Sequence, residues 1–96
     1  MYNVSIYSPQ SEVMKKLLNY LQSRRYKIIG VNHTENKITA EFRHSFFKKF
    51  NFLFKIIPVN PSVTNIEIRV NPEHAEPTSS DLEKENALAE RIYYFF

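Results

Sequence analysis

The chain has 96 residues, of which 43% are hydrophobic and 24% charged, a composition typical of one globular domain and not of a disordered segment. Cysteine is absent, which excludes a disulfide framework and a zinc site with cysteine ligands. No window approaches the roughly 18 uninterrupted apolar residues that a membrane-spanning helix requires, and the N-terminus has no signal-peptide pattern. We therefore expect a single domain over residues 1–96, cytoplasmic and without a transmembrane segment.

The net charge of +3 hides an uneven distribution of charge along the chain. Residues 1–66 carry ten Lys or Arg against three Glu, a balance of +7, whereas residues 67–96 carry three against seven acidic residues, a balance of −4. Such asymmetry is typical of a polyanion-binding half, and equally of two halves that pack beside each other.

The first predicted elements are a strand and a helix. Apolar and polar residues alternate from Tyr2 to Tyr7, which is the period of a half-buried strand. Ser8 and Pro9 indicate a helix start, with Ser8 as the N-cap and Pro9 at the first helical position. Apolar residues at helical spacing then predict a helix that ends near Arg24 or Arg25, and they are Val13, Met14, Leu17, Leu18 and Leu21.

Two further strands are expected at residues 26–31 and 37–43. The polar turn between them contains Asn36, a residue that tolerates the left-handed conformation. Gly30, which has apolar neighbours on both sides, indicates a strand position that a helix or a bulge approaches closely.

The stretch FFKKFNFLFKII, residues 46–57, alternates from about Phe50 onward and predicts a strand that buries Phe52, Phe54 and Ile56 on one face. Residues 45–49 are expected to form a turn or bulge. The proline-containing segment 58–62 is expected to end the strand, and residues 64–70 then alternate again to form the last strand.

Residues 71–80 are predicted to be a loop before a final helix at about residues 81–95. Ser80 and Glu83 form a capping-box pattern, and negative charge gathers at the expected helix N-terminus. The apolar residues of this helix fall roughly on one side, and they are Leu82, Leu88, Ala89, Ile92, Tyr93 and Phe96.

The predicted order is β-α-β-β-β-β-α, which defines an α+β domain with one antiparallel sheet of about five strands and both helices on one face. This order resembles the helix-grip architecture and the repeat unit of the TATA-binding-protein fold.

A fainter resemblance links the chain to a family of small bacterial domains that carry an Ala-Glu-x-Arg-Ser strand and a later Asp-Leu helix start. The matching residues are Ala40, Glu41, Phe42 and Arg43, then Asp81, Leu82 and Asn86. The chain departs from that pattern where His44 separates Arg43 from Ser45 and where Glu83 replaces the usual glycine. Both resemblances imply the fold and leave the function open.

In this architecture the two faces of the sheet have different compositions. The helix-covered face is expected to hold Val4, Ile6, Ile38, Ala40, Phe42, Phe52, Phe54, Ile56, Ile66, Ile68 and Val70. The opposite face is expected to hold Asn3, Ser5, Tyr7, Thr39, Glu41, Arg43, Asn51, Leu53, Lys55, Asn65, Glu67 and Arg69. Because Glu41 and Glu67 would repel phosphates, a solvated face or a polar partner surface is favoured over a nucleic-acid platform.

Basic and aromatic residues form three candidate binding surfaces. A polyanion could bind at Arg24, Arg25, Lys27, Lys48 and Lys49. Phe46 and Phe47 could form an exposed aromatic tip, although a phenylalanine tucked under the sheet edge is the favoured alternative. Tyr93, Tyr94, Phe95 and Phe96 cannot all face one direction on a helix, so some of them should be exposed as a partner surface or at a frayed end.

Catalytic and metal-binding patterns are missing from the sequence. His33, His44 and His74 have no ligand spacing, and the acidic residues beside His74 are typical of a solvated loop. A single glycine excludes a nucleophile elbow and a phosphate-cradling loop.

We therefore predict no catalytic residue, metal or cofactor, and a non-catalytic protein-interaction module that self-associates through the last helix or an edge strand. Two alternatives stay open: nucleic-acid or anionic-surface binding, and an apolar small ligand held between the helices and the sheet.

Overall fold

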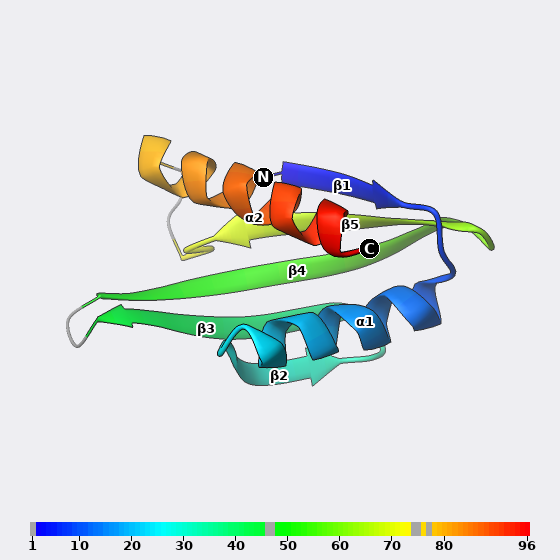
Figure 1. The fold of residues 1–96 in the computed structure, drawn as a ribbon, viewed down its shortest axis with the longest axis horizontal. Helices are drawn as coiled ribbons and strands as arrows, with labels where there is room; N and C mark the ends of the chain where they lie inside the picture. Colours follow the sequence, from blue (N-terminus) through cyan, green and yellow to red (C-terminus); the bar gives the residue numbers. More distant parts are fainter. Residues whose placement is uncertain (1, 46–47, 74–75, 77) are drawn as a thin grey trace.

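The structure of the protein is a computed structural model that describes residues 2–45, 48–73, 76 and 78–96. Seven elements lie in this part of the chain, in the order predicted from the sequence (Figure 1). The strands are β1 (Tyr2–Ile6), β2 (Lys27–Asn32), β3 (Lys37–Ser45), β4 (Lys48–Asn60) and β5 (Val63–Val70). The helices are α1 (Gln10–Ser23) and α2 (Ser79–Phe95).

The described strands form one five-stranded antiparallel sheet with the order β1-β5-β4-β3-β2. The first strand of the chain therefore pairs with the last, and β1 and β2 form the two edges. Both helices lie in front of this sheet in Figure 1, α1 across β2, β3 and β4 and α2 beside β1 and β5. The predicted α+β class, with its single antiparallel sheet, is confirmed.

The core lies between the sheet and the two helices, and its residues follow the predicted alternation. Phe52, Phe54 and Ile56 on β4 are 4%, 0% and 1% exposed, which confirms that these side chains point inward. Burial of each such side chain stabilises the fold by about 1.5–3 kcal/mol. The other expected residues of this face are also buried, except Phe42, which is half-buried at the edge of the core.

Strand β4 is longer at both ends than the sequence predicted. The expectation that Pro58 ends the strand is wrong, since β4 continues to Asn60 and Pro58 lies opposite Thr64 of β5. The register shifts between Pro58 and Asn60, and a proline is tolerated at such a bulge because no regular ladder bond is lost. At the other end a bulge is confirmed between Arg43 and Ser45, but residues 48 and 49 are already strand.

Both helix starts differ from the predicted positions. In α1 the N-cap is Pro9 and not Ser8, because Pro9 keeps an extended ψ of 152° and its carbonyl accepts the first helical bond, from Val13 N at 3.0 Å. The Ser8 carbonyl instead accepts a hydrogen bond from Thr64 Oγ1 at 2.8 Å.

In α2 the capping box is real but is formed by Thr78 and Asp81, two residues before the predicted pair of Ser80 and Glu83. Asp81 Oδ1 also accepts a bond from Asn71 Nδ2 at 3.0 Å, so the buried carboxylate joins the cap to the end of β5. This second partner explains why the earlier pair is the one used.

Two smaller expectations are confirmed in part. A bulge does lie between Ile28 and Gly30, but no helix approaches Gly30, since a Cβ added there would meet nothing within 4 Å. On α2, Leu88, Ala89 and Ile92 are buried as predicted, whereas Leu82 is 48% and Tyr93 57% exposed. The apolar side of α2 is therefore narrower than the sequence indicated.

Candidate ligand-binding cleft between the helices

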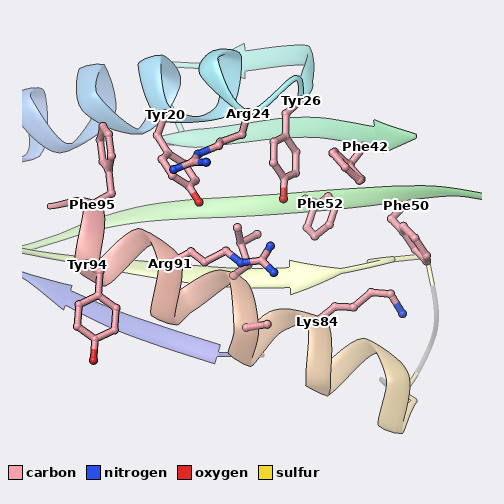
Figure 2. Close-up of a pocket in the computed structure, with 12 residues that line it drawn as sticks. Tyr20, Arg24, Tyr26, Phe42, Phe50, Phe52, Lys84, Arg91, Tyr94 and Phe95 are labelled. Carbon is pink, nitrogen blue, oxygen red and sulfur yellow. The ribbon is translucent and has the colours of Figure 1, made fainter. Parts of the chain in front are cut away.

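A cleft of about 760 Å³ opens where α1 and α2 diverge over the sheet (Figure 2). Its volume lies within the roughly 300–1,000 Å³ typical of small-molecule sites. We call this space the interhelical cleft. It is lined by Tyr20, Arg24, Tyr26, Phe42, Phe50, Phe52, Lys84, Ala87, Leu88, Arg91, Tyr94 and Phe95.

The floor of the interhelical cleft is a cluster of aromatic rings. The antiparallel register places Phe42 of β3 opposite Phe50 of β4, and Phe52 follows two residues later on the same face. The ring centroid of Tyr26 lies 5.0 Å from that of Phe42 and 5.4 Å from that of Phe52. Such tilted and edge-on contacts are favourable for aromatic rings, and they leave an apolar surface facing the cleft.

Tyr26 reaches this cluster because α1 ends in a Schellman motif. The amide of Tyr26 donates to the carbonyl of Leu21 at 2.9 Å, and the amide of Arg25 donates to that of Gln22 at 3.2 Å. Arg25 holds the left-handed position of the motif, with φ of 66°, where glycine is usual. The sharp turn that follows directs the chain from α1 into β2 and places Tyr26 under the helix.

Three cations stand at the rim of the interhelical cleft, one at the C-cap of α1 and two on α2. The guanidinium carbon of Arg24 lies 5.6 Å from the ring centroid of Tyr20, and Lys84 Nζ lies 4.5 Å from that of Phe50. Lys84 and Arg91 are seven residues apart, which is two helical turns, so they lie on the same side of α2. Figure 2 shows Arg24 and Arg91 reaching into the space between the helices.

These rim cations have no acidic neighbour within the cleft. No described residue of the lining is Asp or Glu, and the ion pairs of Lys37 with Glu35 and of Lys49 with Glu41 lie elsewhere. Among the described residues that line the cleft, three cations therefore stand without a carboxylate, which is a charge pattern expected to attract an anion.

Tyrosine hydroxyls add neutral hydrogen-bonding groups to the same space, where Figure 2 shows Tyr20 and Tyr26 pointing inward. Burial raises the pKa of Tyr26, the nearby Tyr20 raises it further, and the Arg91 guanidinium opposes both effects. Tyr26 is therefore a protonated donor throughout the neutral range.

The predicted partner surface at the C-terminus is divided between two sides of α2. Tyr94 and Phe95 line the interhelical cleft, and the Phe95 ring lies 4.8 Å from the Tyr20 ring. Tyr93 instead faces a hollow beside β1, which Tyr94 also borders. The expectation that some of these aromatics are exposed is confirmed, at 57% for Tyr93, 83% for Tyr94 and 47% for Phe95. The other two members of the predicted surface, Phe46 and Phe47, lie outside the described residues.

The residues predicted to bind a polyanion have different surroundings in the structure. Arg24 lies at the cleft rim, and Arg25 holds the turn after α1. Lys27 pairs in register with Glu41, whose carboxylate is also 3.4 Å from Lys49 Nζ. The side chain of Lys48 lies outside the described part of the structure. Glu41 thus offsets part of the positive charge on this side of the sheet.

Sequence reasoning missed most of the interhelical cleft. The spacing of Lys84, Leu88, Arg91 and Phe95 on one side of α2 is a signal that could have been read from the sequence. The approach of Arg24 to the same space could not, because it depends on how far apart the sheet holds the two helices.

Within the described residues no three His, Asp or Glu side chains come together as a metal-binding group. Neither α1 nor α2, the helices of that part of the chain, is long and apolar enough to cross a bilayer.

The fold and the cleft define a class of protein, a small α+β domain with an open aromatic and cationic cleft between two helices. No known family model matches the chain, and no curated protein matches its sequence significantly. The case for a function therefore depends on the geometry of the chain itself.

Proposed function

We propose that this protein is a non-catalytic binding module that holds a small amphipathic anion in the interhelical cleft. The ligand class is an organic carboxylate or sulfonate with an aromatic or otherwise apolar body. The observation that carries the proposal is the combination, in one cleft, of an aromatic floor, three rim cations and no acidic lining residue. Recognition by these groups needs no bond-making step.

The two parts of such a ligand would meet different parts of the cleft. The apolar body would lie on the rings of Tyr26, Phe42 and Phe52, where each Å² of apolar surface removed from water contributes about 25 cal/mol. The anionic group would lie toward Arg24 and Arg91, whose guanidinium groups bind carboxylates through paired, charge-assisted hydrogen bonds. This arrangement supplies the polar anchor that an apolar-ligand hypothesis needs.

A matched pair of fluorescent probes tests the proposal. Pyrenebutyrate and pyrenebutanol share the same apolar body and differ in charge, and the protein has no tryptophan to interfere with pyrene emission. We expect saturable binding of pyrenebutyrate at about micromolar concentration, near −8 kcal/mol, and at least about tenfold weaker binding of pyrenebutanol. Equal affinity for both probes, or no saturable binding of either, would contradict the proposal.

Variants then assign the binding to the cleft. The double substitution Lys84→Gln, Arg91→Gln removes two rim cations from half-buried or exposed positions, so the fold should be retained. Its affinity for pyrenebutyrate should fall at least about tenfold, while affinity for pyrenebutanol changes little. Lys15→Gln on the exposed side of α1 is the control, and it should leave both affinities unchanged.

A further inference from the structure

The two edges of the sheet differ in how they are protected against pairing with another chain. Edge strands present unpaired backbone groups, and natural proteins guard them with charges, prolines or bulges. Strand β2 has such guards, a bulge between Ile28 and Gly30 and the charged Lys27 at its start. Strand β1, Tyr2–Ile6, contains no charge and no proline, and it pairs with β5 without a register shift. β1 is therefore the edge that lacks a charge, a proline and a bulge.

The helix above β1 presents a matching surface. Leu82, Asn86 and Tyr93 are separated by four and seven residues, so they form one line along α2. This line contains no charge, and Leu82 and Tyr93 are 48% and 57% exposed. It lies on the flank of α2 beside β1, because Tyr93 and Asn3 border the same hollow of about 420 Å³. Glu90 also borders that hollow and is exposed.

We propose that a second copy of this chain docks on this side, with β1 pairing antiparallel to β1 around a two-fold axis at Val4. In that register Tyr2 of one copy lies opposite Ile6 of the other, and Asn3 lies opposite Ser5. Every inward residue then faces an inward residue and every outward residue an outward one, since opposite residues in a ladder share a face. The two sheets become one continuous sheet with all helices on the same side.

The spacing of the helices fits this arrangement. Helix α2 contacts both β1 and β5, so its axis lies between them. With strands about 4.8 Å apart, the two α2 axes in the pair would be about 9–10 Å apart. Helices pack at about 8–10 Å, so the C-terminal turns of the two α2 helices would meet in antiparallel contact. Because Val4 borders the same hollow as Ala89 and Tyr93, the helix contact would centre on the C-terminal turns of α2, with Tyr93 of one copy near Tyr93 of the other.

A second copy fits better than an unrelated partner because the surface is complementary to itself. A two-fold interface places the same patch on both sides, so the uncharged strand β1 meets an uncharged strand and Tyr93 meets its equal. Most of the interhelical cleft lies on the other flank of α2, although Tyr94 borders both the cleft and the hollow beside β1. The two proposals are tested separately, since Lys84 and Arg91 do not border that hollow and Asn3 and Ser5 do not border the cleft.

Sedimentation velocity at several protein concentrations tests the dimer directly. The wild-type chain should shift from monomer to dimer as concentration rises, and a monomer at all concentrations would overturn the proposal. The variant Asn3→Lys, Ser5→Lys places a lysine opposite a lysine twice across the two-fold axis. Its dimer should dissociate at least about tenfold more readily.

The Asn3→Lys, Ser5→Lys variant should still fold as a monomer. Both side chains are exposed, and Asn3 lies opposite Glu67 on β5, which is a favourable partner for a lysine. The matched control is Ile29→Lys on the other edge, where Ile29 is 53% exposed. The control should dimerise as the wild type does. A dimer lost in the control and kept in the β1 variant would assign the interface to β2 and overturn the proposal.

The register is tested by cross-linking, since the chain has no native cysteine. Asn3→Cys and Ser5→Cys chains are prepared separately, mixed and oxidised with a mild catalyst. Opposite residues have Cβ atoms about 4.5–5.5 Å apart and diagonal ones about 7–8 Å, so the mixture should cross-link well and each chain alone poorly. Equal cross-linking in all three samples would contradict the Val4-centred register.

Discussion

Arg25 has an unfavourable backbone conformation that the turn after α1 requires. Its φ of 66° is left-handed, which costs an L-residue roughly 1–2 kcal/mol. The cost is offset because the turn closes the end of α1 and brings Tyr26 into the aromatic floor of the cleft. The charge of Arg25, which suggested a polyanion site in the sequence, has no part in this role.

Replacing Arg25 with glycine should therefore stabilise the protein. Relief of the strain should stabilise the folded state by roughly 1–2 kcal/mol, whereas the extra freedom of glycine in the unfolded chain should destabilise it by about 0.4–1 kcal/mol. The net gain in the free energy of unfolding should therefore be about 0.5–1 kcal/mol. Urea unfolding measures it. Arg24→Gly is the control, since φ of −99° at Arg24 needs no glycine, and this change should destabilise the protein. A loss of stability in Arg25→Gly would contradict the strain argument.

Tyr26 gives a prediction about alkaline pH. Burial, followed by Tyr20, raises its pKa above the ordinary value of 10.0, so the folded protein holds this proton more tightly than the unfolded chain does. This contribution to stability is fully present below the unfolded pKa and is lost as pH rises through the folded pKa. Wild-type stability should thus fall above about pH 10, and Tyr26→Phe should fall less steeply. Parallel pH profiles for the two proteins would refute this assignment.

At the scale of elements, the start of α2 shows how a cap is chosen by tertiary contacts. Thr78 and Asp81 satisfy each other's backbone amides, and Asn71 from the end of β5 donates to the same carboxylate. Ser80 and Glu83 have the same local pattern, but both are exposed and no strand end reaches them. The cap therefore lies where the sheet can take part in it.

A pair of alanine substitutions distinguishes the two caps. Thr78→Ala should destabilise the protein by about 0.5–2 kcal/mol, the usual cost of losing an N-cap side chain. Ser80→Ala, an exposed position within the first turn, should stay within about 0.5 kcal/mol of the wild type. Thermal unfolding of both variants measures the difference. A larger loss for Ser80→Ala would place the cap where the sequence alone suggested it.

Element order, strand faces and core residues followed from the sequence because a strand buries alternate residues and few other arrangements fit Phe52, Phe54 and Ile56. Element ends were less predictable. Pro58 looked like a strand terminator, and only the neighbouring β5 ladder makes a bulge there tolerable. The cleft was the least predictable feature, since Arg24 and Lys84 are distant in sequence and line the same cleft only because both helices pack against one sheet.

At the scale of the whole molecule, part of the positive charge that the sequence concentrates in its first two thirds lies beside a carboxylate or lines the cleft. Lys49 pairs with Glu41, Lys27 lies opposite that same carboxylate, and Arg24 turns into the cleft. Polyanion binding needs phosphates to meet several cations at once. We therefore expect polyanion binding through these residues to be weak.

Heparin chromatography measures how strongly the protein binds a polyanion. The protein should elute at or below physiological ionic strength, about 0.15 M, and Arg24→Gln should shift elution no more than Lys15→Gln does. Retention that persists well above that salt concentration, and that Arg24→Gln abolishes selectively, would restore the polyanion hypothesis.

The pairing of β1 with β5 has a consequence for synthesis on the ribosome. Asn3 cannot meet its partner Glu67 until most of the chain has been translated. At about 5–20 residues per second, the first strand waits for several seconds without its ladder. During that interval the β3–β4 hairpin can already form from local contacts, while the uncharged N-terminal strand stays available to strands of other nascent chains. Neighbouring chains on one polysome would be the first competitors for it.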